Sequence, residues 1–353
     1  MQSNPKVSIV IPHYNRFDLL KQTLNSVYHQ TYSDWEIIVV DDYSTSECLE
    51  NIKIFIENES RIQLVVKKNE LKGAPASRNL GLNLARGFYV LFLDADDVLA
   101  PFALEQRVGA FTNANQLYDA VIAPTLNFKT IPGDLLEVWS DFKKKNSVYD
   151  LLEGKPYFQT MGPLWKKNYL NKIGGWHQEL KSYQDWELHI RALLRGMSYK
   201  ELEEHDNFYR IASDEHSIAS RYFQDEVIRG RFDAFKAVYN EIKTSAPTLN
   251  TAPYRAYVIR QFIQLIDHDK INVVSNLLKS YRHYGLTVLD QMLIRMMLRD
   301  GSSWRYRKVT KFSTNFFWSH IDFDPWNKTT KANKPNNSGI RALNYNYKEL
   351  LSQ

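Results

Sequence analysis

The chain has 353 residues, of which 44% are hydrophobic, and its formal net charge is +5. This length exceeds one typical domain and suits two globular domains, the larger with a full α/β core. The net charge is too small for a chain of this size to indicate nucleic acid as a partner.

The sequence has one cysteine, Cys48, in a polar stretch, so we expect no disulfide and a reducing, cytoplasmic setting. Residues 1–6 lead straight into a predicted strand and do not resemble a secretion signal. No apolar run approaches the roughly 20 residues that span a bilayer. We therefore expect a cytoplasmic protein that is soluble or peripheral at the inner membrane surface.

Short apolar runs alternate with amphipathic stretches over the first quarter of the chain. The apolar runs cover residues 7–11, 36–40, 62–66 and 88–93, and the amphipathic stretches cover 16–29, 47–58 and 75–86. Continuously apolar, β-branched runs are typical of strands buried on both faces, as in a mostly parallel sheet covered by helices. The sequence therefore predicts an α/β fold with a βαβαβαβ core.

Polar residues follow each of the four predicted strands. These sets are His13–Asn15, Asp41–Ser44, Lys67–Asn69 and Asp94–Asp97. Ligands of such sheets bind beyond the carboxyl ends of the strands. We therefore expect all four sets to lie on one rim.

The last set holds three carboxylates, Asp94, Asp96 and Asp97. Because strand residues alternate between faces, we expect Asp94 and Asp96 to point the same way and Asp97 to point aside. Two aligned carboxylates suit a hard divalent cation that also binds phosphate oxygens. Taken alone, such a run of acids is more often a solvated turn, so the interpretation depends on the surrounding residues.

Three parts are predicted along the chain. The first, 1–220, is the α/β catalytic domain, with a further strand at 119–128, loops from about 130 to 165, a glycine turn at 174–176 and a helix from Asp185 that ends at Gly196. The second, 221–300, is a helical domain that is a candidate for homo-oligomer contacts, with helices at 232–242, 254–266, 271–284 and 286–298. The third, 301–353, is a basic and aromatic segment with a flexible tail.

Five segments together resemble the ordered motif set of family 2 glycosyltransferases of the GT-A fold. They are Val7–Asn15, Val39–Thr45, Gly73–Asn79, Leu93–Asp97, and Gly174–Trp176 with Gln184–Glu187. The resemblance implies an inverting transfer from a nucleotide sugar, above all a UDP-sugar, with Mn²⁺ or Mg²⁺ as the metal. It also implies a glycan or lipid-linked acceptor, in the synthesis of a surface polysaccharide or glycolipid.

The same resemblance assigns residues to the nucleotide. Pro12 and Tyr14 would line the base pocket, with the Tyr14 ring as a stacking face. Asp42 would accept the imide N–H of uracil, although helix capping is a competing role for it. Arg78 would reach the base or the phosphates, although an arginine on a helix is usually solvated.

Asp94 and Asp96 would be the acids of the family's Asp-X-Asp element, one on the ribose and one on the metal, with Asp97 close by. We take Asp94 as a donor-binding residue and Asp96 and Asp97 as candidate metal ligands, while any of the three can be the one that touches the cation. The cation would neutralise the charge on the departing diphosphate. His216 is a further candidate ligand, with polar surface as its competing role.

An inverting transfer also needs a base that takes the proton of the attacking hydroxyl. Asp185 stands at the aspartate of the family's Glu-Asp pair, at a helix start where free N–H groups would hold it ionised; its competing role is a helix cap. Gln184 departs from the family's glutamate and puts a second carboxylate in doubt. We expect Glu187 on the helix surface, and Trp176 or Trp186 either facing the acceptor sugar or packed in the core.

Other functions fit parts of the sequence. A metal-dependent nucleotidyltransferase also combines an α/β sheet with acids, but residues 13–16 lack the glycine-rich, basic signature expected there. A non-catalytic nucleotide-binding module that assembles through its helices is the other alternative. The cations and aromatic residues at 304–318 suit peripheral contact with an anionic membrane, or packing against the catalytic domain or a second subunit.

Overall fold

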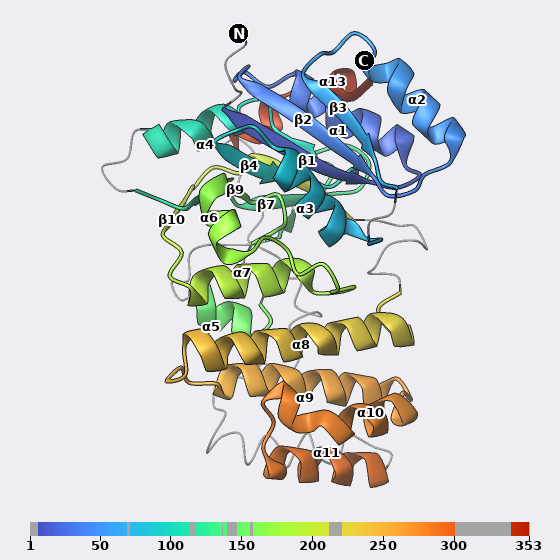
Figure 1. Cartoon of the computed structure of the whole chain (residues 1–353), viewed down its shortest axis with the longest axis vertical. Coiled ribbons are helices and arrows are strands. Elements are labelled where there is room, and N and C mark those ends of the chain that lie inside the picture. The colour runs from blue at the N-terminus through green and yellow to red at the C-terminus, as the bar shows by residue number, and fades with distance from the viewer. Residues whose placement is uncertain are drawn as a thin grey trace.

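The structure is a computed structural model that describes residues 6–68, 71–112, 117–135, 137–139, 147–155, 158–211, 221–300 and 340–352. An α/β half and a stack of helices follow one another along the long axis of the molecule (Figure 1). The candidate ligand His216 and the basic and aromatic segment at 304–318 lie outside the described residues.

A seven-stranded sheet forms the centre of the α/β half, in the order β10-β6-β9-β4-β1-β2-β3. Its strands are β1 (Val7–His13), β2 (Trp35–Asp41), β3 (Ile62–Val66), β4 (Tyr89–Phe92), β6 (Ala120–Ile122), β9 (Pro163–Lys166) and β10 (Tyr199–Glu201). Strand β9 runs antiparallel to both of its neighbours, and the other pairs are parallel. The predicted α/β fold with a mostly parallel sheet is confirmed.

Helices cover both faces of this sheet. One face carries α1 (Phe17–Tyr28), α2 (Ser46–Ile56) and α4 (Ala103–Thr112), and the other carries α3 (Ala74–Leu84), α6 (Lys167–Ile173) and α7 (Gln184–Leu194). Because side chains alternate along a strand, β1 sends Ile9 toward α1 and Val10 toward α3. Helix α3 lies close to β1 because Gly81 has no Cβ; one there would lie 2.3 Å from Cγ1 of Val10.

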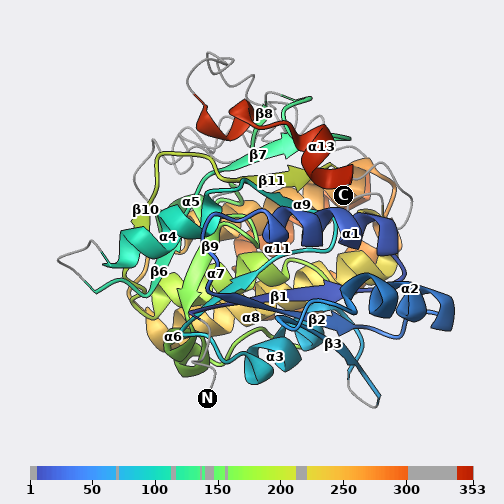
Figure 2. The ribbon, with the colours of Figure 1, turned by 90° about the horizontal axis from the view of Figure 1, so that it is seen from above.

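A four-stranded sheet lies beside the main one, in the order β5-β11-β7-β8 (Figure 2). Its strands are β5 (Val98–Leu99), β7 (Thr125–Phe128), β8 (Glu137–Val138) and β11 (Asn207–Arg210). The predicted strand at 119–128 is therefore two strands, β6 and β7, in different sheets. Pro124 stands at the break, where its missing N–H prevents a continuous ladder.

The end of the chain packs against this second sheet. It forms a 3₁₀ turn, η3 (Arg341–Asn344), and the helix α13 (Tyr347–Ser352), whose apolar residues join a core with Phe102, Phe128 and Phe208. The Asn25 side chain of α1 also donates to the carbonyl of Leu351 at 3.4 Å. Residues 340–352 are therefore packed, whereas the polar stretch 331–339 for which flexibility was predicted lies outside the described residues.

Helices continue from the lower face of the sheet to the far end of the molecule (Figure 1). They are α5 (Ser147–Leu152), α8 (Asp225–Ser245), α9 (Ala252–Asp267), α10 (Ile271–Leu277), the 3₁₀ helix η1 (Leu278–Tyr284) and α11 (Val288–Asp300). One hydrophobic core runs without a break from Phe92 of β4 through Trp186 of α7 to Ile294 of α11. The predicted boundary at residue 220 therefore does not divide the core. None of the helices in the described ranges is long and apolar enough to cross a bilayer.

Candidate active site

A buried pair, His13 and Asp41, joins the ends of β1 and β2. Nδ1 of His13 lies 3.1 Å from Oδ1 of Asp41, and the backbone N–H of Arg16 donates to Nε2 of the same ring. Nε2 therefore accepts, and Nδ1 carries the proton that Asp41 accepts. Burial alone would raise the pKa of Asp41, but hydrogen bonds from His13 and Ser44 outweigh it and lower that pKa. This pair fixes the shape of the rim.

Asp42, the predicted partner of the base, is held by Lys67 and by a backbone N–H. Nζ of Lys67 lies 2.7 Å from Oδ1, and the N–H of Gly73 donates to Oδ2 at 2.8 Å. Asp42 is not a helix cap, because Thr45 caps α2. The Asp42–Lys67 pair was not predicted, although both residues follow neighbouring parallel strands whose last residues, Asp41 and Val66, are partners.

The loops after β1 and β2 are tied together at Asn15, whose φ is 48°. Its N–H donates to Oγ of Ser44 and its Oδ1 accepts from the N–H of Thr45, both at 2.8 Å. A positive φ is a strained backbone conformation for a residue other than glycine, and these two hydrogen bonds hold Asn15 in it. The loop leaves Tyr14 57% exposed, two residues after the half-buried Pro12. The Tyr14 ring is thus accessible for stacking on a planar ligand.

Arg78 of α3 is buried rather than solvated, and it connects two parts of the rim. One Nη2–H donates to Oδ1 of Asp94 at 2.5 Å, and Nη1 donates to Oε1 of Gln184 at 3.3 Å. The guanidinium carbon lies 4.4 Å from the ring centroid of Trp176. Arg78 therefore joins the acids after β4 to the start of α7.

The residues Asp94–Asp97 form a turn between β4 and β5, closed by the N–H of Asp97, which donates to the carbonyl of Asp94 at 3.1 Å. Because β4 ends at Phe92, the turn and not strand alternation sets the directions of the acids, although Asp97 does differ from Asp94 and Asp96 as expected. Asp94 and Asp96 are half-buried, and Oδ2 of Asp96 pairs with Arg16 at 2.9 Å. Asp97 is fully buried and accepts the N–H of Arg210 at 2.8 Å. Asp94 and Asp96 are thus the acids that a ligand can reach.

Burial and the neighbouring carboxylates raise the pKa values of Asp96 and Asp97. Burial and then the charge of Asp94 raise the pKa of Asp96, and burial with the charges of Asp96 and Asp94 raises the pKa of Asp97 well above its usual range. A divalent cation would relieve this repulsion, so the acids fit Mn²⁺ or Mg²⁺. Within the described ranges, no group of three or more His, Cys, Asp or Glu side chains is placed to hold a metal. Mg²⁺ is usually bound by one or two carboxylates together with substrate phosphates.

Asp185 is the second residue of α7 and not its cap, which is Tyr183. Its Oδ1 accepts the N–H of Trp186 at 2.8 Å. Burial raises the pKa of Asp185, although the Trp186 N–H and the charge of Arg78 act in the opposite direction. The Trp186 N–H acts in the expected direction, toward the ionised carboxylate, but burial outweighs it and the net shift of the Asp185 pKa is upward. A raised pKa suits a general base, which works best near the operating pH.

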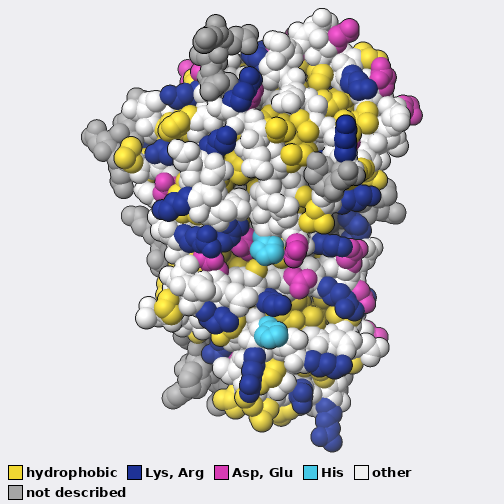
Figure 3. All heavy atoms as spheres, in the orientation of Figure 1, with side chains coloured by type: hydrophobic (Ala, Val, Ile, Leu, Met, Phe, Trp, Pro, Cys, Tyr) yellow, Lys and Arg dark blue, Asp and Glu magenta, His cyan; other side chains and the backbone are white. Residues whose placement is uncertain are grey.

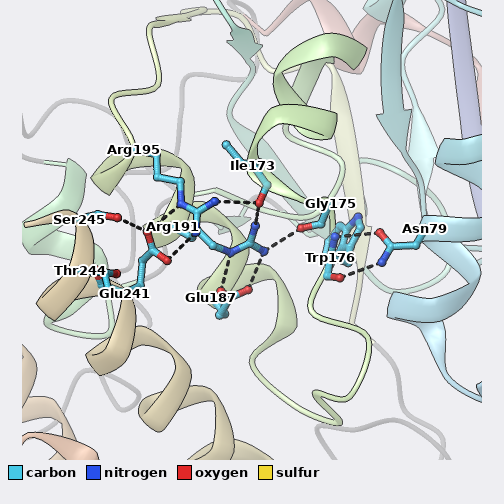
Figure 4. A network of polar contacts seen from close by, with 10 residues as sticks. All are labelled: Asn79, Ile173, Gly175, Trp176, Glu187, Arg191, Arg195, Glu241, Thr244 and Ser245. Carbon is cyan, nitrogen blue, oxygen red and sulfur yellow. Dashed lines mark hydrogen bonds and ion pairs between the residues drawn. The ribbon is translucent and has the colours of Figure 1, made fainter.

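Glu187 is buried, not on the helix surface as predicted. Nε and Nη2 of Arg191, one turn along α7, donate to its two oxygens at 2.7 and 2.9 Å. The other N–H groups of Arg191 donate to the carbonyls of Ile173 at 2.6 Å and Gly175 at 2.7 Å (Figure 4). The pair therefore ties α7 to the turn at 174–176.

Asn79 of α3 ties the same turn to the sheet (Figure 4). Its side chain donates to the carbonyl of Trp176 and accepts the N–H of the same residue, both at 2.8 Å. Gly175, with φ of +63°, leaves room for this contact, because a Cβ there would lie 2.6 Å from Oδ1 of Asn79. Trp176 is buried, with its ring edge-on to Phe92 at 5.1 Å, so it belongs to the core and does not face an acceptor.

Replacing Arg191 with methionine is expected to lower the free energy of unfolding by about 3–5 kcal/mol, because it leaves the Glu187 carboxylate buried without its partner. Lys181→Met is the matched control, since Lys181 pairs with Glu226 at 2.6 Å with both side chains exposed, and we expect no measurable change there. Urea unfolding of both variants measures the difference. Equal midpoints for the two variants would show that the buried pair does not anchor α7.

The helical region holds the start and the end of α7. The hydroxyl groups of Tyr183 and Tyr257 of α9 lie 2.8 Å apart, and the buried Trp186 ring packs against aromatic residues of α8 and α9. At the other end Arg195 pairs with Glu241 of α8 at 2.8 Å (Figure 4). Trp186 is thus a core residue, and the helices after residue 220 determine where Asp185 lies.

This arrangement is the GT-A fold, which two solved glycosyltransferases share. Residues 1–349 of Staphylococcus aureus TarS, solved in complex with UDP-GlcNAc, have a TM-score of 0.61 and 20% identity, covering 90% of this chain and 94% of that one. A mannosyltransferase of Pyrobaculum calidifontis, solved in complex with GDP-Man and Mn²⁺, has a TM-score of 0.51 and 18% identity, covering 90% of this chain and 89% of that one.

Sequence comparison identifies the glycosyltransferase family to which the chain belongs. The family model described as glycosyl transferase family 2 matches residues 8–172. An uncharacterized glycosyltransferase of Methanocaldococcus jannaschii is 32% identical over 59% of this chain and 71% of its own length. The poly(ribitol-phosphate) beta-glucosyltransferase of Bacillus spizizenii is 30% identical over 68% of this chain, which spans 37% of that relative's length. The chain belongs to glycosyltransferase family 2.

Proposed function

We propose that this chain is an inverting glycosyltransferase that moves a sugar from a UDP-sugar to a hydroxyl group of a surface polysaccharide or glycolipid. The contact of Arg78 with both Asp94 and Gln184, next to Asp185, carries the proposal. It brings the acids of the donor side and the candidate base into one site. A direct displacement needs the leaving group and the base to be held together in this way.

The loops after β1, β2 and β3 bind the nucleotide in this proposal. Tyr14 stacks on the base beside Pro12, and Asp42, oriented by Lys67 and Gly73, accepts the imide N–H of uracil. The complex of TarS with UDP-GlcNAc supports a UDP-sugar, whereas the mannosyltransferase complex holds GDP-Man. A guanine donor is therefore the competing choice.

The chemistry divides between the two sides of the site. Asp96, with Asp94 and Asp97 beside it and His216 as a further candidate ligand, would hold Mn²⁺ or Mg²⁺, which supplies positive charge against the departing diphosphate. Arg78 adds a fixed charge on the same side. Asp185 takes the proton of the acceptor hydroxyl, and its raised pKa makes it a stronger base than an ordinary aspartate.

The relatives and the composition support a proposal for the acceptor and the cellular setting. The curated relative from B. spizizenii is named for transfer to poly(ribitol-phosphate), a polymer, which supports a polymeric or lipid-linked acceptor here. We place the reaction in the cytoplasm, consistent with Cys48 as the one cysteine and with its free thiol.

Release of nucleoside diphosphate from a panel of sugar donors tests the proposal. We expect release of UDP from at least one UDP-sugar with Mn²⁺, faster when acceptor is present, and loss of this release with EDTA. Anomeric inversion is read from the product by NMR. Release of pyrophosphate instead would indicate a nucleotidyltransferase, and binding of UDP without turnover of any donor would indicate a non-catalytic module.

A further inference from the structure

Helix α11 carries an apolar face that the described residues leave exposed. The exposed fractions are 77% for Leu289, 53% for Met292, 53% for Met296 and 46% for Val288. These residues recur at three- and four-residue spacing, so they share one side of the helix. The opposite side is buried against the bundle through Ile294 and other residues. We call this exposed side the α11 face.

Exposed cations lie on α11 and on η1, which precedes it. Lys279, Arg282, Arg295 and Arg299 are all exposed, and the last two lie on α11 itself, three and seven residues after Met292. Residues 271–299 contain one acid, Asp290, and it is buried and paired with Arg255 of α9 at 2.8 Å. Figure 3 shows hydrophobic side chains beside Lys and Arg at this lower end of the molecule. The exposed cations of residues 271–299 are therefore not offset by an exposed carboxylate within that range, and the next acid along the chain is Asp300, the last residue of α11.

We propose that the α11 face is a docking surface for an anionic lipid bilayer. Exposed leucine and methionine side chains can enter the boundary between headgroups and acyl chains, while the arginines on the same face reach lipid phosphates. Each cation near such a surface adds attraction that salt weakens. The face lies at the end of the long axis remote from the seven-stranded sheet (Figure 1), so docking leaves the rim of the active site uncovered. The inference does not rest on the proposed reaction.

Charge favours a lipid surface over a second copy of the chain. A two-fold contact places the same patch of both subunits face to face. For the α11 face, that contact would bring Arg295 and Arg299 of each copy toward the same cations of the other. Like charges brought together oppose association. An anionic surface instead neutralises them.

Flotation of the full chain with vesicles tests the proposal. We expect it to float with phosphatidylglycerol–phosphatidylcholine vesicles, to remain at the bottom with phosphatidylcholine alone, and to lose binding as salt is raised. Arg295→Gln with Arg299→Gln is expected to weaken binding about thirtyfold, from the attraction of two cations at an anionic surface. Leu289→Gln with Met292→Gln is expected to remove insertion.

Matched controls come from outside α11 and η1. Leu117→Gln removes an apolar side chain that is 86% exposed, and Lys53→Gln with Lys181→Gln removes two exposed cations. Both controls should float like the wild type, and thermal unfolding should show that all variants are folded. The proposal is overturned if the wild type does not float, or if the α11 variants float as well as the controls. It is equally overturned if light scattering shows a dimer that the Leu289 and Met292 changes dissociate and that does not bind vesicles.

Discussion

Asp185→Asn is expected to lower sugar transfer by about 10²-fold or more while leaving UDP affinity nearly unchanged, because the amide cannot take a proton from the acceptor hydroxyl. The two side chains have nearly the same shape, and the contact with the Trp186 N–H needs only an oxygen acceptor. Steady-state rates with the true acceptor and calorimetric titration of UDP measure the two quantities separately. Near-normal turnover in the variant would place the base elsewhere.

A matched substitution and the pH profile sharpen this test. Asp225 also lies in the first turn of a helix, α8, but it is exposed, so Asp225→Asn should keep full activity. The base acts as a carboxylate, so transfer should fall as the pH drops through its pKa. Burial raises that pKa, so the acid limb of the wild-type profile should lie above the ordinary aspartate value of 3.8. This limb should disappear in Asp185→Asn.

Asp96→Ala is expected to abolish transfer and to remove the Mn²⁺-dependent part of UDP binding, because one carboxylate cannot replace a chelating pair. The fold should survive, since Asp96 is half-buried and its removal relieves the repulsion that raises the pKa of Asp97. Calorimetric titration of UDP with and without Mn²⁺ decides the outcome.

Two comparisons separate a metal role from a general loss of charge. Asp34 is exposed and precedes β2, at the opposite edge of the sheet, so Asp34→Ala should leave metal-dependent binding intact. Asp97→Ala removes the acceptor for the Arg210 N–H and should lower thermal stability as well as activity. Undiminished metal-dependent binding in Asp96→Ala would refute the assignment of this acid to the metal.

The sequence was sufficient to predict β1–β4 and the rim, but not β9 or β10 of the same sheet. Strands buried on both faces appear as continuous apolar runs, so β1, β2 and β3 were predicted to within two residues at each end. The position of the acids followed, because the carboxyl ends of neighbouring parallel strands lie at one edge. The motifs that contain Arg78 and Asp94 were both assigned to the donor side, and the two residues are in contact. The burial of Arg78 was not predicted, because a helix pattern alone does not show which arginine is buried.

Properties that depend on distant parts of the chain were not predictable. Glu187 has the spacing of a surface residue, and its buried pair with Arg191 appears only when Arg191 also bonds the carbonyls of Ile173 and Gly175 in the fold. Tertiary packing likewise buries Asp185, so its pKa rises where helix N–H groups alone would lower it. The sequence likewise does not show whether aromatic residues such as Trp176 and Trp186 face a ligand or the core.

The unbroken core between the sheet and α11 has a consequence for how such enzymes diversify. A helical region joined only by a linker could be exchanged between relatives as a module. Here Tyr183 and Trp186, which flank Asp185, pack on α8 and α9. A helical region from another relative would have to reproduce those contacts to hold Asp185 in its catalytic position. We expect substitutions in Tyr257 and Phe235 to be inherited together with substitutions around Asp185, and chimeras joined at residue 220 to lose turnover before they lose nucleotide binding.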